Sequence, residues 1–140
     1  MLYPVIERTI VVGIDGSTPS LRAAAYAVGL ARREQCHLVA VYVRTLPTSV
    51  LSLVDTGGHA AVATVDAHDE VERQLRAALG GHASLVVRVG EPFTELVEAA
   101  EELHADAVIV GRSANALHRI AGSVAVRLVR CARWPVTVVP

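Results

Sequence analysis

The sequence predicts an α/β fold in which an open five-stranded parallel sheet is flanked by helices, as in a Rossmann-like domain. Three observations lead to this prediction. Short apolar, β-branched runs alternate with longer segments of helical periodicity, which is typical of a parallel sheet covered on both faces. The runs end at clusters of glycine, proline and serine. The chain of 140 residues can bury about two thirds of its unfolded surface, so we expect residues 1–140 to form a single domain.

The first predicted unit is a strand, a helix and a second strand. Residues 9–14 (TIVVGI) are apolar throughout, as in a buried parallel strand. The polar segment from Asp15 to Ser20 is predicted to be a loop followed by helix-start signals, and the helix after it is expected to run to about Arg33. Residues 37–43 form the second apolar run, so a right-handed crossover is predicted. The apolar residues that recur at helical spacing in the first helix are Leu21, Ala24, Ala25, Val28 and Ala31.

The alternation of helices and strands continues through the rest of the chain. Residues 44–59 are predicted to be an irregular surface excursion, because Pro47, two serines and Gly57–Gly58 interrupt any periodicity there. The expected elements that follow are a helix at 60–79, a strand at 85–89, a helix at 92–103, a strand at 106–110, a helix at 122–132 and a strand from Pro135 to Val139. The helix at 92–103 is expected to turn Phe93, Leu96, Val97 and Ala100 toward the core.

The carboxyl ends of these strands are where an open parallel sheet binds ligands. After the fourth strand, Gly111 and the later pair Gly122–Ser123 could bring backbone and helix-start N–H groups against a phosphate. Asp15, directly after the first strand, could accept hydrogen bonds from a ribose or a base, or could cap the first helix. The alternative for the two glycines is an ordinary turn or helix entry. Arg112 and Arg119 could clamp a phosphate or be solvated surface charges.

Composition argues against several other functions. All 13 basic residues are arginine, which excludes a Schiff-base lysine and the lysine of a P-loop. The net charge of −1 offers no basic footprint for nucleic acid, and no apolar run is long enough to span a membrane. The six histidines lack metal-ligand spacing, and His68 is expected on a solvated helical face. Cys36 and Cys131 are expected to be small buried residues. Because no catalytic set is assembled, we predict no enzyme and no metal site.

The last predicted strand suggests self-association. The segment from Pro135 to Val139 is apolar throughout and lies at the chain end. As a sheet edge it would expose unpaired backbone groups, and pairing with the same strand of a second copy would satisfy them under two-fold symmetry. A homodimer through this strand is therefore expected.

The motifs taken in order resemble the universal stress protein family over nearly the whole chain. They include residues 11–17 (VVGIDGS), 89–92 (VGEP), 105–111 (ADAVIVG), Gly122–Ser123 and 134–139 (WPVTVV). The resemblance implies a fold like that of the adenine nucleotide α-hydrolases, a dimer formed through the last strand and a stress-response role in the cytoplasm. It also implies that Asp15 contacts adenosine and that the backbone of Val43 meets adenine.

The resemblance also shows one departure. Members of this family that bind ATP have a sequence similar to G-x2-G-x9-G-[ST] after the fourth strand. Here Gly111 and Gly122–Ser123 match, but Ala114 takes the place of the second glycine and only seven residues separate it from Gly122. Two missing residues remove about 6–7 Å of reach. The leading hypothesis is a dimeric regulatory module that binds an adenine nucleotide, ATP or AMP, at an altered site comprising Asp15, Val43, Gly111, Arg112, Gly122 and Ser123. The alternatives are a nucleotide-independent interaction protein with an unknown protein partner, and slow ATP hydrolysis.

Overall fold

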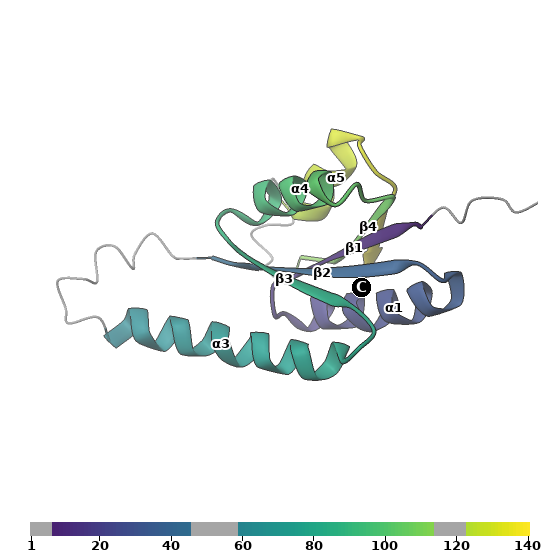
Figure 1. The fold of residues 1–140 in the computed structure, drawn as a ribbon. Coiled ribbons are helices and arrows are strands. Elements are labelled where there is room, and N and C mark those ends of the chain that lie inside the picture. The colour runs from purple at the N-terminus through teal and green to yellow at the C-terminus, as the bar shows by residue number, and fades with distance from the viewer. Residues whose placement is uncertain (1–6, 46–58, 114–122) are drawn as a thin grey trace, which may run out of the picture.

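The computed structural model describes residues 7–45, 59–113 and 123–140, with the side chains of 59–65 left out. Strands and helices alternate along this chain (Figure 1). In order, the elements are β1 (Thr9–Ile14), α1 (Thr18–Glu34), β2 (His37–Arg44), α3 (His59–Leu79), β3 (Ser84–Val89), α4 (Pro92–Glu102), β4 (Ala107–Gly111), α5 (Val124–Cys131) and β5 (Val136–Val139).

The five strands form one parallel sheet in the order β3-β2-β1-β4-β5. The chain winds outward from β1 to β3 and then returns to the other side of β1 with β4. The carboxyl ends of β1 and β4 are therefore the point at which the strand order reverses, the place where doubly wound sheets open a crevice. The predicted parallel α/β sheet is confirmed.

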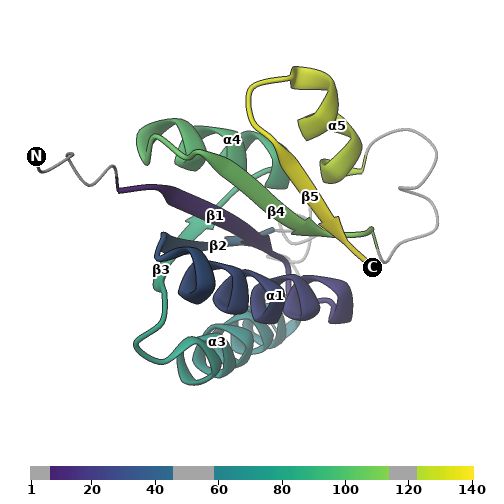
Figure 2. The same cartoon turned by 90° about the vertical axis from the view of Figure 1, so that its right-hand side faces the viewer.

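The sheet lies between two helical layers (Figures 1 and 2). Helices α1 and α3 cover one face, and α4 and α5 cover the other. Strands buried on both faces explain the apolar runs, because each alternate residue enters one of two cores. Val12 and Ile109 belong to the core under α1 and α3, while Val11 and Val108 belong to the core under α4 and α5. Among the described residues no helix is both long and apolar enough to cross a membrane.

The buried face of α1 differs from the predicted stripe. Of the predicted residues, Ala24 and Ala31 are buried and Val28 packs against the core, but Leu21 is 43% exposed and Ala25 is also on the surface. The prediction missed two fully buried residues, Ala23 and Ala27. The helix begins earlier than expected because the Ser17 side chain accepts a hydrogen bond from Ser20 N–H and caps it. Small residues face the sheet because α1 approaches the backbone of β4 closely, as described below.

Other predicted positions shift slightly. β4 begins at Ala107, one residue later than predicted, and the carboxylate of Asp106 just before it accepts a hydrogen bond from the Thr9 N–H at 2.8 Å. The prediction of the core residues of α4 is confirmed, because Leu96 and Ala100 are buried and Phe93 and Val97 pack against the same core. The two cysteines are half-buried rather than fully buried.

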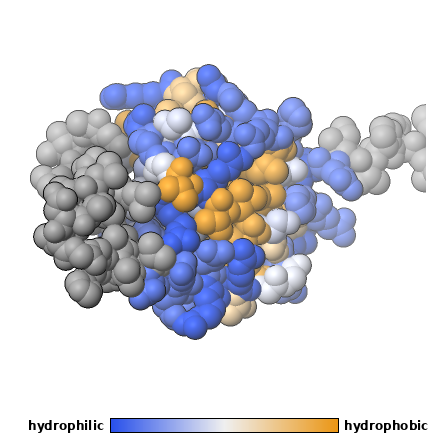
Figure 3. Space-filling view, turned by 60° about the vertical axis from the view of Figure 1, so that its left-hand side comes forward, coloured by the Kyte–Doolittle hydropathy of each residue, from blue (hydrophilic) through white to orange (hydrophobic). Residues whose placement is uncertain are grey.

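On the face that Figure 3 shows, hydrophilic side chains surround a hydrophobic patch. The exposed large hydrophobic side chains among the described residues are Leu21, Tyr26, Val89, Val126, Val129 and Val138. Three of these six, Val126, Val129 and Val138, lie on α5 and β5, at one edge of the sheet.

Candidate functional site

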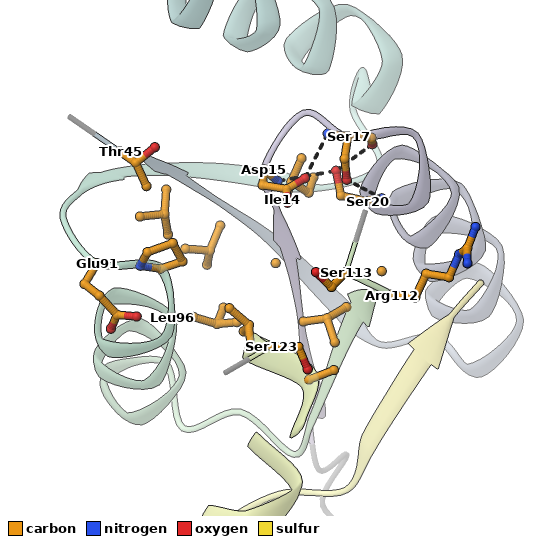
Figure 4. A pocket seen from close by; sticks show the side chains of 18 of the residues that line it. Ile14, Asp15, Ser17, Ser20, Thr45, Glu91, Leu96, Arg112, Ser113 and Ser123 are labelled. Carbon is orange, nitrogen blue, oxygen red and sulfur yellow. Dashed lines mark hydrogen bonds between the residues drawn. The ribbon is translucent and has the colours of Figure 1, made fainter. Parts of the chain in front are cut away.

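A cavity of about 480 Å³ lies at the carboxyl ends of β1, β2 and β4 (Figure 4). Its position at the reversal of strand order follows from the topology. The residues that line it come from the ends of these strands and from the starts of α1, α4 and α5, together with one residue of α3. They include Gly13, Asp15, Ser17, Val43, Thr45, His68, Glu91, Gly111, Arg112, Ser113 and Ser123.

The structure brings together five of the six residues predicted to form a site. Asp15, Val43, Gly111 and Ser123 line the cavity from four different segments of the chain. Arg112 lies at its margin, and Figure 4 shows the guanidinium directed away from the middle of the cavity. Gly122 lies outside the described residues, as does Arg119.

Asp15 occupies the turn between β1 and α1. Its Oδ1 accepts a hydrogen bond from the Ser17 N–H at 2.8 Å, and its own N–H donates to Ser20 Oγ at 3.3 Å. The alternative prediction, that Asp15 caps α1, is therefore correct only in part. Asp15 holds the turn before the helix, and Ser17 is the N-cap. The carboxylate is exposed to the cavity, and the described residues give its Oδ2 no hydrogen-bond partner. One oxygen holds the turn and the other can accept a hydrogen bond from a ligand.

Gly111 has a structural role that the sequence prediction missed. A Cβ atom at this position would lie 2.5 Å from the Pro19 carbonyl carbon and 2.6 Å from the Ser20 nitrogen. The absent side chain thus lets the first turn of α1 pack directly on the end of β4. Neither the turn nor the phosphate contact predicted for Gly111 included this helix-to-strand contact. Glycine is nevertheless common where two backbone segments approach closely.

Ser123 is the N-cap of α5. Its Oγ accepts a hydrogen bond from the Val126 N–H at 3.1 Å, and the residue is only 8% exposed. The hydroxyl proton remains available to a ligand, because the capping bond uses only a lone pair. The N-terminus of α5 and Ser123 therefore present donors to the cavity on the side opposite Thr45, as Figure 4 shows.

His68 is the clearest functional candidate that the sequence analysis missed. It was expected on a solvated helical face, and this expectation is wrong. Its Nδ1 lies 2.6 Å from the hydroxyl of Tyr42, and its Nε2 lies 3.2 Å from the carbonyl oxygen of Thr45. A carbonyl can only accept, so Nε2 carries a proton, and in the neutral ring Tyr42 donates to Nδ1. Burial raises the pKa of Tyr42, which keeps this donor protonated.

The sequence did contain a signal for His68. Val71, Leu75 and Leu79 follow it at helical spacing, and all three belong to or pack against the core. His68 therefore continues the inner face of α3 toward the open end of the sheet. The imidazole reaches the loop after β2 there and becomes part of the cavity wall.

Glu91 supplies a second negative group at the cavity and caps α4. Its Oε2 accepts hydrogen bonds from the backbone N–H and the hydroxyl of Thr94, and its Oε1 accepts one from Arg127 at 2.6 Å. Burial opposes ionisation of Glu91, but the bonds from Thr94 and Arg127 outweigh it and lower the pKa to about 2. Arg127 also lies 4.0 Å above the ring of Phe93, so α5 is tied to the start of α4.

Replacing Glu91 by glutamine is expected to reduce stability in a pH-dependent way. The folded-state pKa is below the ordinary value of 4.5, so the carboxylate stabilises the fold above that pH and loses this contribution as the pH falls toward 2. The difference in unfolding free energy between the two proteins should be about 1 kcal/mol at pH 7, because the half-exposed site is screened by solvent.

The measurement is urea unfolding of both proteins between pH 7 and pH 2, with Glu98→Gln as the control on the exposed side of α4. The gap between wild type and Glu91→Gln should narrow below pH 4.5. A gap that keeps its size down to pH 2 would show that the charge of Glu91 contributes nothing.

Comparison with known proteins identifies the family. The family model described as the universal stress protein family matches residues 7–140. The universal stress protein MJ0531 of Methanocaldococcus jannaschii is 30% identical over 141 residues, covering 96% of this chain and 82% of that protein. A universal stress protein solved in complex with cAMP is 28% identical, with a TM-score of 0.66 and coverage of 95% of this chain and 97% of that one.

Further solved structures agree. A universal stress protein family member from Burkholderia pseudomallei is 25% identical, with a TM-score of 0.68 and 99% of each chain covered. MJ0577, at 18% identity and a TM-score of 0.75 over 96% of each chain, shares the fold. The resemblance seen in the sequence is confirmed, and this chain belongs to the universal stress protein family.

Proposed function

We propose that this chain is a regulatory module that binds an adenine nucleotide in the cavity at the carboxyl ends of β1, β2 and β4. The observation that carries the proposal is the convergence of Asp15, Val43 and Ser123 on one cavity from separate elements. Its volume of about 480 Å³ is in the range of small-molecule sites. The likeness to a family member solved with cAMP, at 28% identity, supports an adenine nucleotide as the ligand class.

The chemistry of the walls suggests how the nucleotide would lie. Val43 and Thr45 offer apolar surface and backbone groups for the base, beside His68. Asp15 offers a carboxylate oxygen to the ribose hydroxyls. Ser123 and the start of α5 offer donors to the first phosphate. This order places the sugar at the reversal of strand order and the phosphate toward α5.

The shortened segment between Gly111 and Gly122 favours nucleotides with fewer phosphates. Residues 114–122, which include Ala114, lie outside the described part of the chain. Two residues fewer than the ATP-binding motif give the segment about 6–7 Å less reach. We therefore propose AMP, ADP or cAMP as better ligands than ATP. Catalysis is no part of this proposal.

The decisive experiment starts from the purified protein. The protein is denatured, released nucleotide is identified by mass spectrometry, and AMP, cAMP, ATP and GMP are titrated into the nucleotide-free protein by calorimetry. The proposal expects AMP or cAMP to bind with a dissociation constant below the millimolar range and GMP to bind more weakly. If no nucleotide is released and no heat of binding appears at millimolar AMP or cAMP, the proposed nucleotide site is wrong. The chain is then better explained as a nucleotide-independent interaction protein.

We also propose that the chain forms a homodimer through β5. This strand is at the edge of the sheet, hydrogen-bonded in parallel to β4, and Thr137 and Val138 on it are exposed. Antiparallel pairing with a second copy would extend the sheet and satisfy the free edge. Sedimentation equilibrium should show a dimer for the wild type and a monomer for Thr137→Lys. A monomeric wild type at micromolar concentration would rule the dimer out.

The alternative of a nucleotide-independent interaction protein would use the surface excursion predicted at residues 44–59. All of that segment except Arg44, Thr45 and the start of α3 lies outside the described residues. A protein partner, a stress-response role and a cytoplasmic location remain predictions of the family resemblance.

A further inference from the structure

The side chain of His68 joins two positions of the chain on either side of Val43. Its Nδ1 lies 2.6 Å from the hydroxyl of Tyr42, and its Nε2 lies 3.2 Å from the carbonyl oxygen of Thr45. Tyr42 is buried within β2, and Thr45 directly follows the last residue of that strand. The imidazole on α3 therefore bridges a fixed point of the sheet and the chain that leaves it, and Val43 lies between these two contacts.

The chain after β2 needs such a contact, because the pairing of the strands ends there. β2 pairs with β1 as far as Tyr42 and with β3 as far as Arg44, whose carbonyl oxygen accepts a hydrogen bond from the Gly90 N–H at 3.1 Å. Thr45 lies beyond both pairings and lines one end of the cavity, as Figure 4 shows. The hydrogen bond from His68 thus extends the support of the backbone into the cavity wall.

The orientation of the His68 ring is set by contacts within the protein. The Tyr42 hydroxyl donates to Nδ1, which leaves the proton of the neutral ring on Nε2, the atom that faces the Thr45 carbonyl. Asp69, the next residue on α3, lies 3.1 Å from Arg44 in an ion pair, and this contact holds the same part of α3 beside the end of β2. The donor to Thr45 is therefore in place before any ligand binds.

We infer that His68 is a positioning residue of the proposed nucleotide site, which orders the backbone from Val43 to Thr45 against which an adenine base would lie. The inference rests on the proposed function and makes it more specific, because it names the group that prepares the base end of the cavity. A segment that is ordered before binding spares the ligand the loss of conformational entropy that ordering it would require. His68 raises affinity in this way for adenosine as well as for its phosphates.

The test compares His68→Gln with His68→Asn, because the two amides replace different nitrogens of the ring. The amide NH2 of glutamine can take the place of Nε2 and donate to the Thr45 carbonyl, whereas the shorter asparagine reaches only the position of Nδ1. Calorimetry should show adenosine binding about tenfold more weakly to His68→Asn, the size of ordering the backbone of one residue. His68→Gln should bind adenosine nearly as well as the wild type.

Gln74→Asn is the matched control, since it makes the same exchange between the two amides on the exposed side of α3. It should bind adenosine with wild-type affinity. NMR of the ligand-free proteins gives a reading that does not depend on a nucleotide. The wild type should carry the His68 proton on Nε2, and the backbone order parameter of Thr45 should fall in His68→Asn but not in His68→Gln. Thermal unfolding verifies that the variants are folded.

The other outcomes contradict the inference. If the wild type binds adenosine and His68→Asn binds it equally well, the positioning role is wrong and the proposed nucleotide site stands. Equal losses in the two His68 variants, or a wild-type proton on Nδ1, also overturn the role. If His68→Asn does not fold, a loss of adenosine affinity in His68→Gln overturns it. If the wild type binds no adenosine, the proposed function and the positioning role are both wrong.

Discussion

Replacing Gly111 by alanine is expected to destabilise the protein by about 3 kcal/mol, the upper range for overpacking a well-packed site. The added Cβ would lie 2.5 to 2.7 Å from backbone atoms of Pro19 and Ser20. Backbone atoms cannot rotate away as the end of a flexible side chain can. The first turn of α1 must therefore move off β4, which also disturbs the turn that holds Asp15.

Gly81→Ala is the matched control, because a Cβ at that position meets no atom within 4 Å. It should leave stability unchanged or raise it slightly by restricting the unfolded chain. Urea unfolding measures both variants. Similar midpoints for the two would mean that α1 can shift at little cost, and that the close contact of α1 with β4 contributes nothing to stability.

Replacing Asp15 by asparagine is expected to weaken adenosine binding by about tenfold, the effect of losing one charge-assisted hydrogen bond. Asparagine keeps an Oδ1 atom that can accept from the Ser17 N–H, so the turn before α1 should survive. The variant replaces Oδ2, the carboxylate oxygen proposed to accept from the ribose hydroxyls, by an amide NH2 group that can only donate. Adenosine is the ligand for this test because it is neutral, and repulsion between Asp15 and phosphate does not enter.

Asp106→Asn provides the control for the Asp15 variant. Asp106 also accepts a backbone hydrogen bond, from the Thr9 N–H, but it lies at the amino end of the sheet. Calorimetry should show wild-type adenosine affinity for Asp106→Asn. If Asp15→Asn also binds adenosine with wild-type affinity, Asp15 does not contact the ligand and serves only to hold the turn before α1.

Most of the fold could be predicted from local sequence patterns. β1 was predicted with both ends correct, because all of its residues are apolar and a polar turn follows at once. The start of α1 was not, because the cap at Ser17 and the contact at Gly111 decide where that helix begins and which face it buries. Leu21 fits the predicted helical period, but the face of α1 that packs on the sheet carries Ala23, Ala27 and Ala31, and Leu21 is 43% exposed.

The candidate site divides in the same way. Asp15 and Gly111 stand at the ends of strands, and Ser123 stands at the start of a helix. Because the carboxyl ends of parallel strands meet at one edge of a sheet, the convergence of these three residues could be predicted. Helical spacing could have placed His68 on the inner face of α3, but not in the cavity wall, since its partner Tyr42 lies 26 positions earlier in the chain. No local pattern reports a hydrogen bond between a helix and a strand that meet only after folding.

The sequence by itself determined the strand and helix order, the aliphatic core and the family, because these depend on periodicity and on motifs read along the chain. Only the tertiary structure decided that the first turn of α1 packs on Gly111 and that His68 joins the cavity wall. The physical reason is distance along the chain: these contacts join residues from separate elements, and packing of the two helical layers on the sheet brings them together.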